Sequence, residues 1–289
     1  MKLGTRWLVA LGAVLALLLT ACGDPEAGQP GGEETEDTAA DLGLVEDGTL
    51  RVGSDINFAP FEFIEDGEEK GFDVDLMNAI AERLGLEVEY VNTSFDTIFT
   101  QLAAGEFDAI VSAITITDER KQTIAFSDPY FQANQALVAT KGSGIESVDD
   151  LDGKDLGTQA GTTGLDYAKE HFTGATIKEF QDAPAGFTAL SAGQVDAMFI
   201  DVPVAVEQVK NNDDLALVEE VSTNEEYGIG VQQDSEALLE AINGALEEII
   251  ADGGYAEIFE RWFAGAEVPE RFTGASASGS ASGVTEDES

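Results

Sequence analysis

The sequence contains one cysteine, one histidine and only 14 lysine and arginine residues, against 57 aspartate and glutamate residues. A single cysteine, Cys22, excludes an intramolecular disulfide. No Ser-His-Asp, Cys-His or metal-ligand spacing is present, because the one histidine, His171, stands far along the chain from the motifs described below. The formal net charge of −43 at pH 7 repels nucleic acid, which excludes DNA and RNA as partners.

The surplus of carboxylates predicts a halophile-like acidic surface. Like charges spread over a surface repel one another, and they destabilise the compact state unless salt screens them. We therefore expect a fold that requires salt, or a protein from a high-salt habitat. The alternative is an acidic bias of the lineage that places no physical demand on the fold.

The N-terminus has the pattern of an export signal. Lys2 and Arg6 precede an apolar run, residues 7–19, that is short for a membrane span, and small residues follow it. Residues 19–22, Leu-Thr-Ala-Cys, resemble a bacterial lipobox, which implies cleavage before Cys22 and acylation of that residue. We expect residues 1–21 to be a lipoprotein signal peptide. The mature protein would then be extracytoplasmic, at the outer face of the cell membrane or in the periplasm, with only its lipid anchor in the membrane. An ordinary signal peptide and a short transmembrane anchor are the alternatives.

Both ends of the remaining chain have compositions typical of disorder. Residues 22–47 are rich in Gly, Pro, Glu, Asp and Thr, with almost no large apolar side chains, so we expect a disordered acidic tether. Residues 266–289 contain Ser/Gly/Ala repeats and a Glu-Asp-Glu run, and we expect a disordered tail. The region between them is long enough for two small lobes or one large domain.

Strand and helix patterns alternate through this middle region, which indicates an α/β fold with mainly parallel sheets. The helix predicted over residues 72–84, for example, has an apolar stripe and ends at Gly85, a residue suited to the left-handed cap position. The predicted strands cover residues 50–54, 88–91, 109–114, 155–158, 177–180, 197–200 and 227–231. The predicted helices cover residues 72–84, 95–104, 165–171, 183–192, 235–251 and 255–263, and a further helix starts near Pro203.

A weak internal repeat suggests two lobes of similar construction. Residues 102–110, Leu-Ala-Ala-Gly-Glu-Phe-Asp-Ala-Ile, match residues 190–198, Leu-Ser-Ala-Gly-Gln-Val-Asp-Ala-Met. Each copy has a helix end, a glycine suited to the left-handed region, an aspartate and an apolar strand. A chance likeness of two helix–glycine–strand joints is the alternative.

The most informative stretch covers residues 112–130. Thr117 is a candidate helix N-cap, and it would place Asp118 and Glu119 in a first helical turn, where negative charge is favourable. Arg120 does not fit this pattern, because a cation near a helix start is unfavourable. A guanidinium beside hydroxyls and helix N–H groups at a strand end is, however, a good receptor for a carboxylate. A surface ion pair is the alternative.

Two segments of this stretch resemble the signature of the bacterial extracellular solute-binding proteins of family 3: Thr-Ile-Thr-Asp-Glu-Arg at 115–120 and Phe-Ser-Asp-Pro-Tyr at 126–130. The resemblance extends over about residues 50–265 as an unbroken order of motifs. It implies the substrate-capture subunit of an ABC importer of polar amino acids.

The resemblance also implies the two-lobed periplasmic-binding-protein fold of type II, in which each lobe is a mainly parallel sheet flanked by helices. Two hinge crossovers would connect the lobes, near residues 130–134 and near residues 224–228. Lobe 1 would then be discontinuous, with residues 48–131 and 228–265, and lobe 2 would hold residues 135–224.

A cleft that holds an amino acid as a zwitterion follows from the same resemblance. Arg120 would bind the ligand α-carboxylate, together with backbone N–H groups near Thr115 and Thr163. Asp201 would accept hydrogen bonds from the α-ammonium, together with the carbonyl of Ala113 and the hydroxyl of Thr115. One guanidinium and one carboxylate thus match the two charges of the zwitterion.

By the same resemblance, the ligand side chain would stack on Phe58 and Phe95, and its polar end would meet Asp55 and Gln159. These candidates follow predicted strands, at the strand ends where open α/β sheets place ligand sites. The predicted ligand-binding residues are Asp55, Phe58, Phe95, Ser112, Ala113, Thr115, Arg120, Gln159, Thr163 and Asp201.

Three departures from familiar relatives limit the choice of ligand. Gln159 stands where some glutamine-binding members carry Lys, Ile200 where some carry His, and Ala113 where Gly is frequent. A neutral Gln159 weakens the case for an acidic ligand and leaves glutamine, other polar neutral or basic amino acids open. Asp55 and Asp73 could favour a basic side chain, although Asp73 is at least as good a candidate for the cap of the helix over residues 72–84.

We therefore expect a monomer that captures a free polar amino acid, glutamine or a basic one, by hinge closure, and that delivers it to the permease subunits of an ABC importer. No catalytic residue, cofactor or metal site is predicted. One alternative is a cyclohexadienyl (prephenate or arogenate) dehydratase-like lyase on the same scaffold, which would need a general acid in the cleft. Another is a sensory binding protein that presents its closed form to a receptor.

Overall fold

The computed structural model of the protein describes residues 42–274. The predicted signal peptide, Cys22, most of the predicted tether and the last part of the predicted tail lie outside these described residues. The described chain forms two five-stranded sheets and one two-stranded hairpin, and seven α-helices accompany them. No helix within residues 42–274 is both long and apolar enough to cross a membrane.

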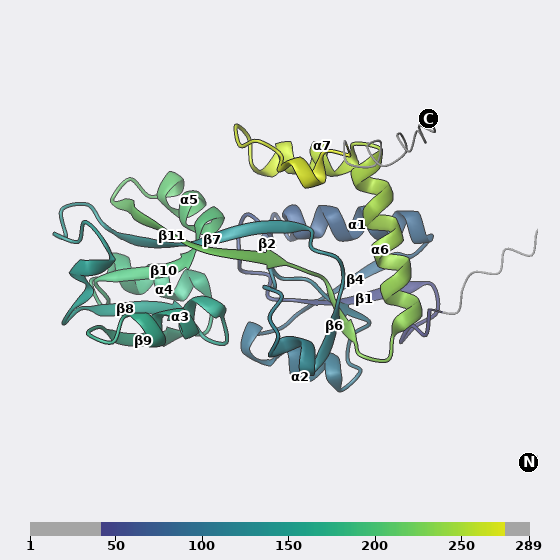
Figure 1. The fold of residues 1–289 in the computed structure, drawn as a ribbon, viewed down its shortest axis with the longest axis horizontal. Helices are drawn as coiled ribbons and strands as arrows, with labels where there is room; N and C mark the ends of the chain where they lie inside the picture. The colour runs from purple at the N-terminus through teal and green to yellow at the C-terminus, as the bar shows by residue number, and fades with distance from the viewer. Residues whose placement is uncertain (1–41, 275–289) are drawn as a thin grey trace, which may run out of the picture. The chain divides into compact units, whose positions relative to one another are not determined.

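The first sheet, with its helices, is called lobe 1. Its strand order is β4-β1-β5-β12-β6, and β1 pairs in parallel with β4 and β5, whereas β12 is antiparallel to β5 and β6. Helices α1, α6 and α7 contribute to the core on one face, and α2 packs on the other (Figure 1). The elements of lobe 1 are β1 (Thr49–Ser54), β2 (Phe63–Glu65), β3 (Glu68–Lys70), α1 (Phe72–Leu84), β4 (Glu87–Asn92), α2 (Phe95–Ala103), β5 (Ala109–Ile110), a 3₁₀ turn (Arg120–Gln122), β6 (Ile124–Phe126), β12 (Gly230–Gln232), α6 (Glu236–Ala251), α7 (Gly254–Trp262) and a 3₁₀ turn (Glu270–Phe272).

The second sheet, with its helices, is called lobe 2. Its strand order is β11-β7-β10-β8-β9; β8 is parallel to both β9 and β10, and β7 is antiparallel to β10 and β11. The elements of lobe 2 are β7 (Phe131–Thr140), a 3₁₀ turn (Val148–Leu151), β8 (Asp155–Gln159), α3 (Thr163–His171), β9 (Thr176–Phe180), α4 (Ala183–Ser191), β10 (Ala197–Asp201), α5 (Val202–Asn211) and β11 (Leu215–Tyr227).

Alternating side chains of β7 show why this sheet is covered on both faces. Ala136 and Val138 belong to the core cluster that includes residues of α4 and α5, whereas Leu137 and Ala139 belong to a second cluster with α3. Successive residues of a strand point to opposite faces, so a strand buried on both sides has an unbroken apolar sequence. This is the run that the sequence has at residues 136–139.

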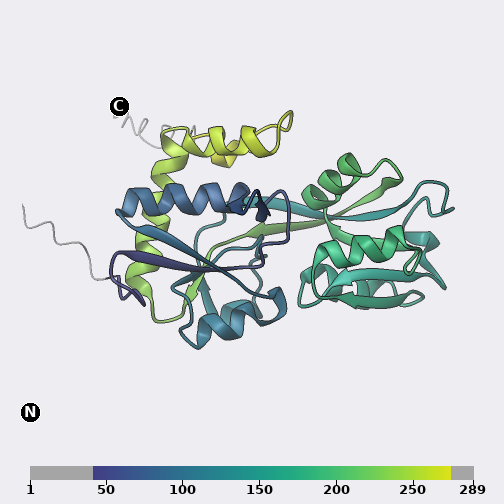
Figure 2. The ribbon, with the colours of Figure 1, turned by 180° about the vertical axis from the view of Figure 1, so that it is seen from behind.

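Strands β7 and β11 connect the two lobes. They pair antiparallel from Tyr227 opposite Phe131 at one end to Leu215 opposite Thr140 at the other. In Figure 1, and from behind in Figure 2, both strands run side by side out of lobe 1 into the sheet of lobe 2. The chain therefore passes between the lobes along these two neighbouring strands, which lie where the crossovers were predicted.

The internal repeat corresponds to a shared three-dimensional joint. Gly105 and Gly193 both have left-handed φ values, 78° and 69°. In lobe 1 the side chain of Asp108 accepts a hydrogen bond from the backbone N–H of Arg51 at 2.8 Å, and in lobe 2 that of Asp196 accepts from the N–H of Asp155 at 2.8 Å. Each aspartate thus attaches the strand that follows the glycine to the start of a neighbouring strand.

Two predictions around the 112–130 stretch are wrong. The predicted strand over 109–114 is only two residues long, because the backbone turns at Ala113, which has a left-handed φ of 46°. No α-helix follows Thr117; a single 3₁₀ turn, Arg120–Gln122, lies there instead. The hydroxyl of Thr117 does accept from the N–H of Arg120 at 3.1 Å, so it closes one turn without starting a helix.

The second crossover is longer than predicted. The predicted strand over 227–231 is divided between the end of β11 at Tyr227 and the short β12 (Gly230–Gln232). Most of β11 precedes the predicted strand. Its middle is half-buried and rich in glutamate, because it lies at the edge of the sheet of lobe 2, and so it lacks the apolar pattern of a core strand.

The predicted disorder extends too far at both ends. Leu42 and Leu44 pack against the core of lobe 1, and the N–H of Val45 donates to Asp108 at 2.7 Å, so residues 42–47 are part of the fold. At the other end Phe272 is 2 % exposed, and its ring lies 4.9 Å from that of Tyr255. A polar segment can thus be held on the folded lobe by a few apolar side chains, two leucines at one end and one phenylalanine at the other, when these are buried against an apolar surface.

Candidate ligand-binding site

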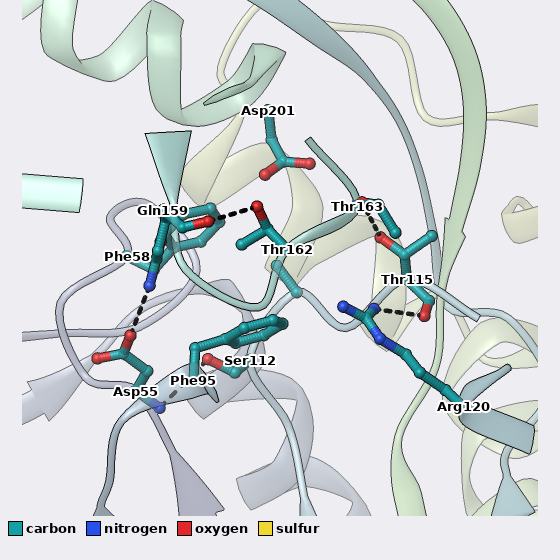
Figure 3. Close-up of a pocket in the computed structure, with 11 residues that line it drawn as sticks. Asp55, Phe58, Phe95, Ser112, Thr115, Arg120, Gln159, Thr162, Thr163 and Asp201 are labelled. Atoms are coloured by element: carbon teal, nitrogen blue, oxygen red, sulfur yellow. Dashed lines mark hydrogen bonds between the residues drawn. The ribbon is translucent and has the colours of Figure 1, made fainter. Parts of the chain in front are cut away.

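All ten residues predicted for the ligand site line one crevice between the lobes, together with Thr162, which was not predicted. The cavity among them has a volume of only about 10 Å³, so the side chains nearly fill the crevice in this arrangement. Figure 3 shows their side chains converging from both lobes. Lobe 1 supplies Asp55, Phe58, Phe95, Ser112, Ala113, Thr115 and Arg120, and lobe 2 supplies Gln159, Thr162, Thr163 and Asp201.

Strand ends explain this convergence. Asp55 follows β1 and Ser112 follows β5, two parallel strands whose carboxyl ends lie at the same edge of the lobe 1 sheet. Gln159 ends β8 and Asp201 ends β10, which are parallel strands of lobe 2. Ligand sites of open α/β sheets form at such edges, because the loops that leave neighbouring strands diverge there.

Arg120 is held by its own lobe and by lobe 2. One guanidinium nitrogen donates to the carbonyl of Thr115 at 2.7 Å, and another donates to the carbonyl of Gly161 at 3.1 Å. The guanidinium also lies over the rings of Phe95 and Phe99, 5.4 and 4.8 Å from their centroids. Burial lowers the pKa of Arg120 to about 10, so the side chain remains a cation at neutral pH.

Asp201 lies across the crevice and is fixed through one oxygen. Its Oδ1 accepts hydrogen bonds from the hydroxyl of Tyr227 at 2.6 Å and from Nε2 of Gln135 at 2.9 Å. Burial and, in smaller part, the nearby charge of Glu225 raise the pKa of Asp201 to about 7. The carboxyl group is therefore poised to become fully ionised when a cation is placed beside it.

Glu225 is a buried carboxylate at this site that the sequence did not suggest. It lies on β11, and one of its oxygens accepts from the hydroxyl of Thr115 in lobe 1 at 2.6 Å and from that of Thr163 in lobe 2 at 2.7 Å. Its other oxygen accepts from Gln135 at 2.8 Å and Thr223 at 2.9 Å. Glu225 thus joins both lobes to the strands that connect them.

The far end of the crevice is polar and negative. Nε2 of Gln159 donates to Oδ2 of Asp55 at 2.8 Å, and Nδ2 of Asn57 lies 3.4 Å from Oδ1 of the same carboxyl group. The pKa of Asp55 is raised to about 6, chiefly by burial and in smaller part by the charge of Asp182. Oε1, the side-chain carbonyl oxygen of Gln159, is buried without a hydrogen-bond partner, which leaves an acceptor available at this end.

The crevice is closed by hydrogen bonds from one lobe to the other. Gln159 bonds to Asp55, and Arg120 to the Gly161 carbonyl, from one lobe to the other. At the rim, Nε2 of Gln181 donates to the hydroxyl of Ser94 at 2.7 Å. Phe58 and Phe95 are each 6 % exposed, so the apolar walls are likewise covered.

One sequence prediction near the site, the capping role of Asp73, is corrected by the structure. Asp73 does not cap α1; the N-cap is Gly71, and Asp73 is a fully buried residue of the first turn whose side chain bonds elsewhere. His171 lies at the end of α3 with its ring 4.1 Å from that of Tyr167, and it does not line the crevice. Within residues 42–274 no group of three or more His, Cys, Asp or Glu side chains could hold a metal ion.

Comparisons with known proteins agree with this geometry. Residues 50–265 match the bacterial extracellular solute-binding proteins, family 3. The chain is 37 % identical over 268 residues to a probable histidine-binding protein of Neisseria gonorrhoeae, covering 90 % of this chain and 96 % of the relative. It is 35 % identical over 266 residues to the ABC transporter glutamine-binding protein GlnH of Bacillus subtilis, covering 90 % and 97 %.

A solved structure of an ancestral arginine-binding protein bound to glutamine is similar as well. It has 43 % sequence identity and a TM-score of 0.73, and the likeness covers 75 % of this chain and 99 % of that one. These matches confirm the predicted two-lobed α/β fold of type II, and they confirm the prediction of a solute-binding protein rather than an enzyme. The chain belongs to the bacterial extracellular solute-binding proteins of family 3.

Proposed function

We propose that this protein captures a free polar amino acid between its lobes and delivers it to the permease subunits of an ABC importer. The observation that carries the proposal is that Arg120 and Asp201 face one crevice from opposite lobes. A guanidinium and a carboxylate fixed in this way match the α-carboxylate and α-ammonium groups of a zwitterion. Water is excluded when the lobes are closed, which strengthens both contacts.

The carboxylate end of the ligand would lie between Arg120 and the start of α3. This helix begins at Thr163 and is capped by the Thr162 hydroxyl, which accepts from the N–H of Leu165 at 3.1 Å. Thr162 and Thr163 line the crevice, so the N-terminus of α3 lies at its wall, and an anion is favourable at a helix N-terminus. A ligand carboxylate would replace the Gly161 carbonyl as the partner of Arg120.

The ammonium end would lie at Asp201, with the Thr115 hydroxyl as a second acceptor. Thr115 donates its own proton to Glu225, so its lone pairs remain open to an incoming donor. The carbonyl of Ala113 is the third acceptor in this proposal. Phe58 and Phe95 would cover the aliphatic part of the ligand.

We infer a basic amino acid or glutamine as the ligand. Asp55 lies at the far end with Asp182 contributing further negative charge, which favours a cationic side chain. The unpaired side-chain oxygen Oε1 of Gln159 can accept a hydrogen bond from either an amide or a guanidinium group of the ligand. The ancestral arginine-binding relative bound to glutamine supports the view that one pocket of this kind accommodates both.

The remaining parts of the proposal concern location and organisation. We infer that Cys22 carries the lipid anchor on the extracytoplasmic side and that the protein acts as a monomer. Lobe 1 would comprise residues 48–131 and 228–265 with the ordered segments at either end, and lobe 2 residues 135–224. Hinge bending would occur in β7 and β11, the strands that both lobes share.

Isothermal titration calorimetry with a panel of amino acids tests the proposal. Wild-type protein is expected to bind at least one basic or amide amino acid, and Arg120→Ala is expected to weaken that binding about 100-fold or more, because a buried charged partner is lost. The matched control is Lys121→Ala, which removes the exposed neighbouring cation. Absence of binding by any amino acid, or equal effects of the two substitutions, would contradict the proposal.

A further inference from the structure

Two carboxyl groups are buried beneath the floor of the crevice and belong to none of the ligand contacts described above. Glu62 and Asp73 are both 0 % exposed, and neither lines the crevice. No arginine or lysine forms an ion pair with either of them in residues 42–274. A buried carboxylate without a cation is costly, so this pair requires an explanation.

The start of α1 brings the two acids together. The N–H of Phe72 donates to the carbonyl of Pro60 at 3.0 Å, and that of Asp73 donates to the carbonyl of Phe61 at 3.0 Å. The segment before Glu62 therefore caps the helix in place of a side chain. Gly71 permits this approach, because a Cβ atom there would lie 1.9 Å from the Phe61 carbonyl oxygen.

Each acid forms a hydrogen bond with one of two neighbouring residues that line the crevice, Ser112 and Ala113. Oε1 of Glu62 accepts from the hydroxyl of Ser112 at 2.7 Å, and that hydroxyl lies 3.2 Å from the N–H of Asp55, from which it accepts. Oδ2 of Asp73 accepts from the N–H of Ala113 at 2.8 Å and from the hydroxyl of Tyr130 at 2.8 Å. Ala113 has a left-handed φ of 46°, which is unfavourable for a residue with a Cβ atom and needs such support.

The second oxygen of each acid has no N–H or O–H partner elsewhere. Oε2 of Glu62 and Oδ1 of Asp73 are both buried without a hydrogen-bond partner, and the two carboxyl groups lie within hydrogen-bonding reach of one another. One proton on Glu62 would satisfy both atoms at once, as an O–H donated to Asp73. Two ionised carboxylates would instead leave two repelling charges in an apolar core.

We propose that Glu62 and Asp73 form one acid–carboxylate pair that retains a single proton at neutral pH, and that this pair positions Ser112 and Ala113 for ligand binding. The positioning role rests on the function proposed above; the shared proton does not. Glu62 is the protonated member, because Asp73 accepts two further hydrogen bonds that favour its ionised form.

The groups that face the pair support this assignment. Burial and the neighbouring charges of Asp73 and Asp55 raise the pKa of Glu62 well above its usual range, whereas that of Asp73 rises only to about 6. The other titratable groups nearby are the phenols of Tyr90, Tyr130 and Tyr255, which remain neutral at pH 7. None of them supplies a positive charge that would allow both acids to ionise.

The test compares Glu62→Gln with Glu62→Ala in the full chain. The amide of Gln reproduces protonated Glu62, because its oxygen accepts from Ser112 and its NH₂ donates to Asp73. Glu62→Gln is therefore expected to keep the affinity for the best amino acid within about twofold, whereas Glu62→Ala weakens it about tenfold by leaving buried groups unpaired. Glu89→Gln, at an exposed glutamate of β4, is the control for loss of one charge.

Infrared difference spectroscopy at pH 7 reads the proton directly. Wild-type protein is expected to have a carbonyl stretch of a protonated carboxyl group that Glu62→Gln lacks and that Glu89→Gln retains. A missing band, or a Glu62→Gln variant as impaired in binding as Glu62→Ala, would overturn the proposal. If the wild type binds no amino acid, the proposed function and the positioning role both fall, and the band alone decides whether the proton is shared.

Discussion

Nε2 of Gln159 lies 2.8 Å from Oδ2 of Asp55, so one hydrogen bond joins lobe 2 to lobe 1 at the end of the crevice away from Arg120 (Figure 3). In this arrangement the two side chains satisfy one another. A ligand side chain that donates to Oδ2 of Asp55 would displace Nε2 of Gln159 from it. The same ligand side chain could then donate a second hydrogen bond to Oε1 of Gln159. The pair therefore selects for side chains that carry donors.

Asp55 should make the affinity for basic amino acids depend on pH. Its pKa of about 6 in the free protein means that a cationic side chain binds best when the carboxyl group is ionised, above that pH. Affinity for arginine should fall by up to about tenfold per pH unit below 6, in excess of any loss for glutamine. Titration of both ligands from pH 5 to 8 measures the difference, and Asp55→Asn should abolish it. Equal pH profiles for the two ligands would contradict this role.

Asp201 should lower the free energy of unfolding of the protein at neutral and higher pH, although it strengthens ligand binding. Because its pKa rises from 3.8 unfolded to about 7 folded, its contribution to stability is complete below pH 4 and is lost as pH rises through 7. Asp201→Asn keeps an oxygen for Tyr227 and Gln135 without the buried charge. At pH 8 this variant should be more stable by about 4 kcal/mol, on the order that such a shift implies, yet should bind the amino acid about 100-fold more weakly.

Denaturant unfolding of both proteins at pH 4 and pH 8 measures the effect. The two should differ by less than about 1 kcal/mol at the lower pH, where Asp201 is protonated in the folded state and still partly protonated in the unfolded state. A variant that is less stable than wild type at pH 8 would show that the charge of Asp201 is compensated in the free protein.

Glu225 should favour the closed arrangement of the lobes. Thr115 and Thr163 both donate to one of its oxygens, and Gln135 and Thr223 donate to the other. In Glu225→Gln the NH₂ group cannot accept, so if it faces the hydroxyls of Thr115 and Thr163, these must turn to accept from it and lose the bonds that they donate to the carboxylate. We expect affinity to fall about tenfold, by the same factor for every amino acid that binds, because the cost falls on closure rather than on recognition.

Small-angle X-ray scattering of the ligand-free protein gives an independent measure of this effect. The radius of gyration of Glu225→Gln should exceed that of the wild type, while Glu226→Gln, at the neighbouring half-buried residue that pairs with Arg271, should not change it. A change in the ranking of amino acids, with no change in dimensions, would assign Glu225 to ligand recognition instead.

The acidic composition should make the fold depend on salt. With 57 acidic residues against 14 basic ones, most carboxylates have no basic partner, and their repulsion falls when salt shortens the screening length. The melting temperature of the ligand-free protein should therefore rise by several degrees between low and molar sodium chloride. A melting temperature that stays constant or falls would indicate that the composition places no such demand on stability.

The strand-end residues could be predicted because two regularities act together. Alternating strands and helices place Asp55, Gln159 and Asp201 after predicted strands, and parallel strands end at a common edge. The order of motifs that resembles a known family then assigns them to one crevice. Neither regularity depends on contacts between distant residues.

Glu225 and Glu62 were missed because burial of a carboxylate depends on such contacts. Glu225 lies in a run of glutamates and threonines on an edge strand, and its partner Thr115 is 110 residues earlier in the chain. Backbone carbonyls of residues 60 and 61, directly before Glu62, cap the first N–H groups of α1, and no local sequence pattern indicates this. Asp73, in the first turn of that helix, had instead the local pattern of a capping residue. Locally, each of these acids has the sequence environment of an exposed residue, and only the fold distinguishes them.

The central claim is that Arg120 recognises the carboxylate of a ligand whose ammonium group meets Asp201. The most direct measurement is the affinity of the tightest-binding amino acid and of the corresponding amine that lacks the carboxyl group, in wild-type protein and in Arg120→Ala. Wild type should prefer the amino acid about 100-fold or more, and Arg120→Ala should bind the two compounds about equally. If Arg120→Ala keeps the wild-type preference, Arg120 does not recognise the carboxylate and the account is wrong.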